Sequence, residues 1–223
     1  MPLDINSKIK GVIFDLDGVI VDTAKFHFNS WKKIASEWNY ELKYNDNEKL
    51  KGVSRMDSVL KIAEWAEINL SSEELEHAAN RKNEIYTELC AKLTPEHILP
   101  GIMSLINQLN ANNICIALGS ASKNARLVLK KIGLLTLFDV IVDGNDVSKS
   151  KPNPEVFIKA AKQMNLLPKN CVVVEDAPAG IIAALSANMK VIGIGKSNEL
   201  HTANLVIENS KNLSIDLLNQ ISG

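Results

Sequence analysis

The segment that decides the fold of this chain is Val12-Ile13-Phe14-Asp15-Leu16-Asp17-Gly18-Val19-Ile20. An apolar run leads into Asp15, which is typical of a buried strand, and Asp17-Gly18 is a turn signal that ends it. Two carboxylates therefore emerge at the carboxyl end of a strand, where open α/β sheets bind their ligands. On a continuing strand the two side chains would diverge, whereas a turn that begins at Asp17 lets both approach one centre. An Asp-x-Asp pattern alone is often a solvated strand end, but the apolar run and the glycine favour a site.

The composition is that of a globular protein that can bury a large core, with 223 residues of which 46% are hydrophobic. The formal net charge of -1 argues against nucleic acid or an acidic membrane as the main partner. Neither an N-terminal apolar h-region nor an 18-residue apolar run appears, so we expect no signal peptide and no membrane-spanning helix. Cys90, Cys115 and Cys171 are odd in number and scattered, which favours reduced thiols. We therefore expect a cytoplasmic protein whose partners are small molecules. We also expect a monomer, although none of these features determines the oligomeric state.

From about residue 22 to residue 93, the pattern predicts helices joined by loops and no strand. Apolar residues at spacings of three and four form one face of the first helix: Ala24, Phe28, Trp31, Ala35 and Trp38. A loop over residues 51–55 precedes a second helix, and a capping signal near Ser71 begins a third that runs to about Cys90. His27 borders the face that contains Trp31, and Lys82 interrupts the apolar stripe of the third helix. From the pattern alone, a histidine at the core edge and a lysine that snorkels to solvent are the ordinary interpretations.

After Pro100-Gly101 the pattern alternates between helices and strands. The predicted strands cover residues 114–118, 138–142, 171–175, 191–194 and 205–207, and the predicted helices cover residues 101–110, 123–132, 154–164, 178–188 and 215–221. This alternation predicts an α/β protein with a doubly wound, Rossmann-like parallel sheet. We expect residues 1–21 and 97–223 to form this catalytic core domain, and residues 22–96 to be inserted in it as an all-helical cap domain.

Polar side chains gather where the predicted core strands end. Residues 120–124 follow one strand, Lys151 lies near the next connection, and Glu175-Asp176 ends a third strand. Carboxylates without histidine or cysteine partners suit a hard, oxygen-seeking cation, above all Mg²⁺. A serine and a lysine beside such a cation suit a phosphoryl group. The sequence therefore indicates phosphoryl chemistry at one edge of the sheet.

These motifs resemble those of the haloacid dehalogenase superfamily of phosphotransferases. The segment Phe14-Asp15-Leu16-Asp17-Gly18-Val19 is similar to its first motif, Ser120 to its second, Lys151 to its third, and Glu175-Asp176 to its fourth. The similarity spans the core, and the helical insert is similar to the small cap of that superfamily. Ala177-Pro178 departs from the pattern, in which a serine is frequent, and this puts one hydrogen bond near the acidic pair in doubt.

Within the superfamily, the chain most resembles the β-phosphoglucomutase family. This narrower resemblance depends on Thr23, His27 and Trp31, on residues 51–55, on Arg81-Lys82-Asn83 and on residues 120–124. It implies an Mg²⁺-dependent phosphotransferase and isomerase that converts β-D-glucose 1-phosphate to glucose 6-phosphate. The implied activating intermediate is β-glucose 1,6-bisphosphate, and the implied partners are sugar phosphates.

The resemblance also implies roles for single residues. The catalytic residues would be Asp15, Asp17, Thr23, His27, Ser120 and Lys151. Asp15 would be the nucleophile that becomes an aspartyl phosphate, and Asp17 the general acid and base, positioned by His27. One Mg²⁺ per chain would be held by Asp15, Asp176 and the carbonyl of Asp17, with Glu175 as a close neighbour or further ligand.

The implied substrate-binding residues come from both domains. They are Trp31, Lys51, Gly52, Val53, Ser54, Arg55, Lys82, Ser120, Ala121, Ser122, Lys123 and Asn124. Among them, Ser120 would hold the transferring phosphoryl group. Arg55 and residues 122–124 would bind the distal phosphate, and Lys82 with residues 51–53 would line the sugar site.

Other functions stay open on the sequence alone. The nearest alternative is an Mg²⁺-dependent sugar-phosphate phosphatase of the same superfamily, because the same aspartate pair serves hydrolysis. A phosphonate-cleaving hydrolase would use Lys51 or Lys82 of the cap as a Schiff base. A sugar-phosphate sensor without catalysis is disfavoured by the intact aspartates and Lys151. A halide-cleaving enzyme would need neither Asp17 nor the metal carboxylates.

Overall fold

The computed structural model describes residues 9–221 and is built on a six-stranded sheet in the order β3-β2-β1-β4-β5-β6. The strands are β1 (Gly11–Phe14), β2 (Cys115–Gly119), β3 (Val140–Val142), β4 (Cys171–Glu175), β5 (Lys190–Ile194) and β6 (Leu205–Ile207). Every pairing between these strands is parallel. The order reverses at β1, and ligands of such sheets bind outside the carboxyl ends of the strands at this point. The predicted doubly wound α/β fold is confirmed.

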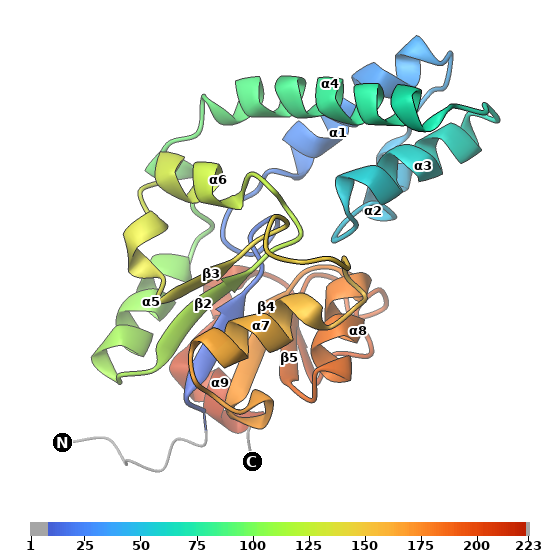
Figure 1. Ribbon diagram of the computed structural model, residues 1–223. Helices are drawn as coiled ribbons and strands as arrows, with labels where there is room; N and C mark the ends of the chain where they lie inside the picture. The colour runs from blue at the N-terminus through green and yellow to red at the C-terminus, as the bar shows by residue number, and fades with distance from the viewer. Residues whose placement is uncertain (1–8, 222–223) are drawn as a thin grey trace.

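Helices cover both faces of the sheet (Figure 1). The helices that follow the insert are α5 (Ile102–Ala111), α6 (Ala125–Lys131), α7 (Glu155–Gln163), α8 (Pro178–Ser186) and α9 (Ile215–Gln220). Since successive side chains of a strand point to opposite faces, Phe14 packs in the cluster that includes α5, α6 and α9. Ile13 packs in the cluster that includes α7 and α8. Strand β1 is therefore buried on both sides, which explains its uninterrupted apolar sequence.

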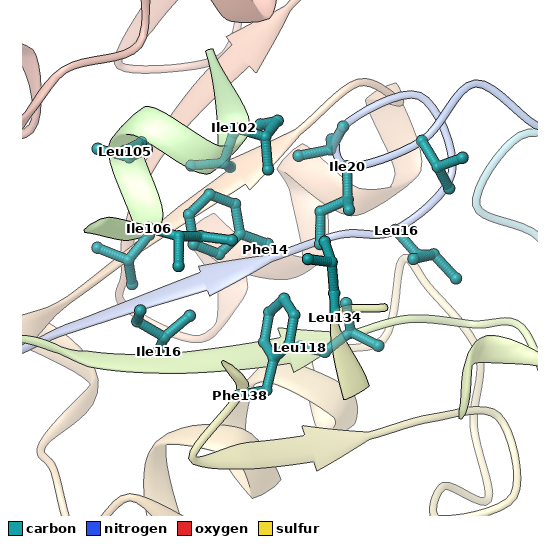
Figure 2. Packing of buried hydrophobic residues seen from close by; sticks show 14 of the residues in the cluster. Phe14, Leu16, Ile20, Ile102, Leu105, Ile106, Ile116, Leu118, Leu134 and Phe138 are labelled. Atoms are coloured by element: carbon teal, nitrogen blue, oxygen red, sulfur yellow. The ribbon is translucent and has the colours of Figure 1, made fainter. Parts of the chain in front are cut away.

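Figure 2 shows how densely the first of these clusters surrounds β1. Side chains of α5, among them Ile102 and Ile106, lie against the Phe14 ring. Phe138 approaches it edge-on, with 6.4 Å between the ring centroids. Because Phe14 directly precedes Asp15, this packing fixes the backbone from which the first carboxylate of the site projects.

The insert consists of four helices, α1 (Ala24–Glu37), α2 (Tyr44–Glu48), α3 (Arg55–Trp65) and α4 (Ser72–Cys90), which lie above the sheet in Figure 1. Helices α1, α3 and α4 share an apolar cluster that includes Trp31, Ile34, Val59 and Ile62. The far end of α4 differs, because Tyr86 and Cys90 pack in the core cluster. The division into a core and a cap domain at residues 21–22 and 96–97 stays a prediction. Residues 1–8 and 222–223, which it assigns to the core, lie outside the described residues.

The predicted elements agree with the structure to within a few residues, with two corrections. Strand β1 ends at Phe14 rather than at Asp17, because the chain turns where the Leu16 carbonyl accepts hydrogen bonds from the amides of Ile20 and Val21. The short helix α2 was not predicted. Within residues 9–221, the structure contains no helix with the length and apolar character needed to cross a membrane.

Candidate active site

A cavity of about 690 Å³ is lined by residues from the carboxyl ends of the strands and from the helical insert. This volume lies in the usual range for small-molecule sites, roughly 300–1,000 Å³. Its lining includes these predicted residues: Asp15, Asp17, His27, Trp31, Lys51, Gly52, Val53, Ser54, Arg55, Lys82, Ser120, Ala121, Ser122, Lys123, Asn124, Lys151 and Asp176. The two other predicted site residues, Thr23 and Glu175, are fully buried and contact residues that line the cavity.

Asp15 lies in a buried ion-pair cluster with Lys151 and Glu175. The Lys151 ammonium lies 2.6 Å from Asp15 Oδ1 and 2.6 Å from Glu175 Oε1. Burial raises the pKa of Asp15 to about 7, although the charge of Lys151 opposes this shift. Burial would lower the pKa of Lys151, but the two carboxylates outweigh it and the pKa lies above its ordinary value. Lys151 is therefore a fixed positive charge beside the predicted nucleophile.

The Asp15 carboxylate also lies close to two further carboxylates. Asp15, Glu175 and Asp176 each offer an oxygen within 4.8 Å of the other two. Burial, followed by the negative charge of Glu175, raises the pKa of Asp176 well above its ordinary value. Gly18, at φ 85°, lies so close that a Cβ at this position would collide with the Asp176 carboxylate. An all-oxygen donor set with excess negative charge fits a divalent cation such as Mg²⁺.

The Glu175 carboxylate is held by backbone groups as well as by Lys151. Its Oε2 accepts hydrogen bonds from the amide of Asp176 at 2.7 Å and from the amide of Ala177 at 2.8 Å. Position 177 carries alanine where a serine is frequent in the superfamily motif. The backbone amide of Ala177 still anchors the acidic pair, so this contact does not depend on the side chain at that position.

Two residues of the insert lie beside the Asp17 carboxylate. The Thr23 hydroxyl donates a hydrogen bond to Asp17, and His27 Nε2 lies 3.6 Å from Asp17 Oδ1. Burial raises the pKa of Asp17, but the neighbouring His27 and Thr23 outweigh it, so that the pKa lies below its ordinary value. Burial and the charge of Lys82 lower the pKa of His27. Asp17 is thus a carboxylate that can accept a proton at a fixed position.

Lys82 is buried, which contradicts the interpretation that it snorkels to solvent. Its side chain is 3% exposed, and its Nζ lies 3.0 Å from His27 Nδ1. The ammonium also lies over the rings of Trp31 and Tyr86, at 4.8 and 4.6 Å from their centroids. Burial and the charge of Arg55 lower the pKa of Lys82 to about 7. Lys82, His27 and Asp17 therefore form one connected polar chain from the insert to the core.

Further polar contacts join the insert to the core around the cavity, besides those of Asp17 with Thr23 and His27. Asn124 donates to Asn83 at 2.7 Å, Ser150 donates to Asp57 at 2.9 Å, and Lys51 lies 3.4 Å from Asp176. Asp57 and Ser150 were not predicted as site residues. No periodicity marks them, because their contact joins positions that are 93 residues apart in the chain.

Comparison with known proteins identifies the family to which this chain belongs. The sequence model of the haloacid dehalogenase-like hydrolases matches residues 12–194. The chain belongs to this family. The family resemblance predicted from the four motifs is therefore confirmed. The protein is an enzyme of the phosphotransferase and isomerase kind that this family includes.

The relatives of this haloacid dehalogenase-like hydrolase include mutases and phosphatases. It is 41% identical to the beta-phosphoglucomutase of Bacillus subtilis (strain 168) over 95% of both chains. The crystal structure of a beta-phosphoglucomutase from Clostridium difficile matches with a TM-score of 0.93 and 42% identity, over 96% of this chain and 97% of that chain. A phosphorylated carbohydrates phosphatase of Thermotoga maritima is 28% identical over 82% of this chain and 84% of that protein.

Proposed function

We propose that the chain is a cytoplasmic, monomeric β-phosphoglucomutase that interconverts β-D-glucose 1-phosphate and glucose 6-phosphate through β-glucose 1,6-bisphosphate. One observation carries the proposal. The Asp15 centre and a second set of phosphate-binding groups, Arg55, Lys123 and Asn124, line the same cavity. A sugar with a phosphate at each end can therefore present either one to Asp15. The identity with the Bacillus subtilis mutase supports this proposal over the phosphatase alternative.

In the proposed first half-reaction, an Asp15 carboxylate oxygen attacks phosphorus and the bond from phosphorus to the leaving sugar oxygen breaks. Lys151, at 2.6 Å from Asp15, and the Ser120 hydroxyl hold the phosphoryl oxygens. Mg²⁺ bound by Asp15, Asp176 and the Asp17 carbonyl would supply charge that offsets the repulsion between carboxylate and phosphate. With β-glucose 1,6-bisphosphate as the donor of its 1-phosphate, the products are an aspartyl phosphate and glucose 6-phosphate. In the second half-reaction the 6-hydroxyl of a β-glucose 1-phosphate attacks the aspartyl phosphate, which restores the Asp15 carboxylate and forms the bisphosphate again.

Asp17 handles the proton in both halves. It protonates the leaving sugar oxygen in one direction, and it takes the proton of the attacking hydroxyl in the other. Thr23 donates a hydrogen bond to its carboxylate, His27 lies 3.6 Å from it, and Lys82 contacts the other ring nitrogen of His27. Because His27 and Lys82 belong to the insert, Asp17 has these partners as general acid and base only when the insert lies against the core.

The anomer of the substrate tests the proposed function. With Mg²⁺ and a trace of bisphosphate, β-glucose 1-phosphate should give glucose 6-phosphate. α-Glucose 1-phosphate should be a poor substrate, because its phosphate projects differently from the ring. Coupled detection of glucose 6-phosphate with each anomer measures this, and equal rates with both anomers would contradict the proposal.

Removal of the Arg55 side chain tests the distal phosphate site. An arginine–phosphate pair is charge-assisted and can be bidentate. Arg55→Ala should therefore lower kcat/KM for β-glucose 1-phosphate. The lost transition-state stabilisation should be roughly 2–4 kcal/mol, the cost of losing one partner of a buried charge pair. The loss should be far smaller with acetyl phosphate, which carries only one phosphate.

Arg81→Ala is the matched control for this experiment. Arg81 lies on the neighbouring helix α4 and pairs with Glu37 at 2.9 Å, outside the cavity lining. Its removal should change neither rate. Equal losses with both phosphoryl donors in Arg55→Ala would show that Arg55 does not bind the second phosphate.

A further inference from the structure

The loop over residues 120–124 contains much of the proposed distal phosphate site. It has few hydrogen bonds between its own residues. Within it, the Ser120 hydroxyl accepts a hydrogen bond from the Ser122 amide at 3.1 Å, and the Ser122 hydroxyl accepts one from the Asn124 amide at 3.2 Å. The loop needs further support from neighbouring segments, because phosphate-binding geometry depends on where its amides and side chains are held.

The turn that follows β3, residues 143–146, supplies such support. The Gly144 amide donates to the Ser122 carbonyl at 3.2 Å. The Asn145 side-chain Nδ2 donates to the Lys123 carbonyl at 3.1 Å. A Cβ at Gly144 would collide with the Ala121 carbonyl, so only glycine allows the turn to approach the loop this closely. Two consecutive residues of the turn thus hold two consecutive residues of the loop.

The Asn145 amide is itself fixed by a buried carboxylate. Asp143 is 1% exposed, and its Oδ1 accepts the Asn145 backbone amide at 2.8 Å and the Asn145 Nδ2 at 2.9 Å. The other oxygen accepts Arg126 Nε at 3.1 Å, and Arg126 also donates to the Ile141 carbonyl at 2.9 Å. Both protons of the Asn145 amide group are therefore used, one toward Asp143 and one toward the phosphate loop.

We propose that Asn145 is a positioning residue for the distal phosphate, and that it acts through the backbone of Lys123. This inference rests on the proposed function, since it assigns a support to the distal phosphate site of that same cavity. Asn145 is not among the residues that line the cavity, whereas Lys123 and Asn124 are. Its effect must therefore reach the substrate through the loop, and it should alter binding of the distal phosphate without altering chemistry at Asp15.

Two variants of Asn145 test this inference. Asn145→Ala removes the bond to Lys123, and Asn145→Asp places a carboxylate oxygen against the Lys123 carbonyl and the Asp143 carboxylate. Asn145→Ala should raise KM for β-glucose 1-phosphate by about three- to tenfold, as for one lost hydrogen bond. Asn145→Asp should raise it further. In both, kcat and turnover of acetyl phosphate should stay at the wild-type value.

The matched control is Asn112→Ala. Asn112 follows α5 and also donates its side-chain amide to a backbone carbonyl, that of Gln108 at 2.8 Å, but outside the cavity lining. It should leave KM, kcat and the acetyl phosphate rate unchanged. Thermal unfolding followed by circular dichroism shows whether all three variants are folded at the assay temperature.

The outcomes separate this inference from the proposed function. An unchanged KM in both Asn145 variants, or equal losses with β-glucose 1-phosphate and acetyl phosphate, would overturn the positioning role. If the wild-type protein only hydrolyses hexose phosphates, the proposed mutase function fails. The inference is then decided by the KM for hydrolysis of β-glucose 1,6-bisphosphate, which keeps one phosphate in the distal site while the other reacts at Asp15; a selective rise in the Asn145 variants supports it and its absence overturns it.

Discussion

Asp15→Asn is expected to abolish turnover while the fold stays intact. An amide of the same shape cannot form the acyl phosphate, and it also removes the charge that pairs with Lys151 at 2.6 Å. The loss in kcat should be roughly 10⁴-fold or more, as for the removal of other enzymic nucleophiles. The rate is measured with β-glucose 1-phosphate, and the fold by circular dichroism.

The covalent intermediate gives a second measure of the same prediction. Wild-type protein quenched during turnover should contain an acid-stable, base-labile phosphoryl group that Asp15→Asn lacks. Asp22→Asn is the control, because Asp22 is exposed in the same connection and an asparagine there can still accept the amide of Ala24. Substantial activity in Asp15→Asn would falsify the assignment of the nucleophile.

Removal of the metal is expected to have an effect of similar size. Asp15, Glu175 and Asp176 bring three carboxylates within 4.8 Å of each other, and an incoming phosphate adds further negative charge. Lys151 supplies one positive charge against this repulsion, so most of it remains without a divalent cation. EDTA should therefore abolish activity, and Mg²⁺ should restore it.

Calorimetric titration separates binding of the metal from activity. Asp176→Ala should bind Mg²⁺ much more weakly than the wild type, because it removes one of the three carboxylates. Asp216→Ala, an exposed residue in the first turn of α9, should bind it normally. Full activity in chelator, or unchanged Mg²⁺ affinity in Asp176→Ala, would contradict the metal assignment.

The core of this fold could be predicted from sequence because its signals are local. Alternating helices and strands require a parallel sheet, and parallel strands place their carboxyl ends at one edge. Asp15, Ser120 and Glu175 each stand at or just after such a strand end, so their proximity follows from the topology. The strand end itself was placed too late, because the hydrogen bonds of the Leu16 carbonyl are not visible in the apolar pattern.

The insert was harder to predict, since its functional contacts join distant segments. Lys82 fits the rule for a snorkelling lysine, and only the arrangement of helices α1 and α4 shows that His27, Trp31 and Tyr86 surround it. Helix α2 is five residues long and too short for a periodic signal. The support of residues 120–124 by Asn145 depends on two loops that only the pairing of β2 with β3 brings together.

The central claim is that the cavity transfers the phosphoryl group to sugar rather than to water. Cavity residues of the insert, Arg55 and Lys82 among them, can bind a sugar phosphate, whereas water is too small to use these contacts to close the site. His27→Ala should therefore lower transfer more than hydrolysis, because His27 links closure of the insert to Asp17.

The most direct test follows glucose 6-phosphate and free phosphate together in one reaction with β-glucose 1-phosphate, Mg²⁺ and a trace of bisphosphate. We expect glucose 6-phosphate formation to exceed phosphate release by orders of magnitude. If free phosphate is instead the main product from every hexose phosphate tried, the protein is a phosphatase and the mutase assignment is wrong.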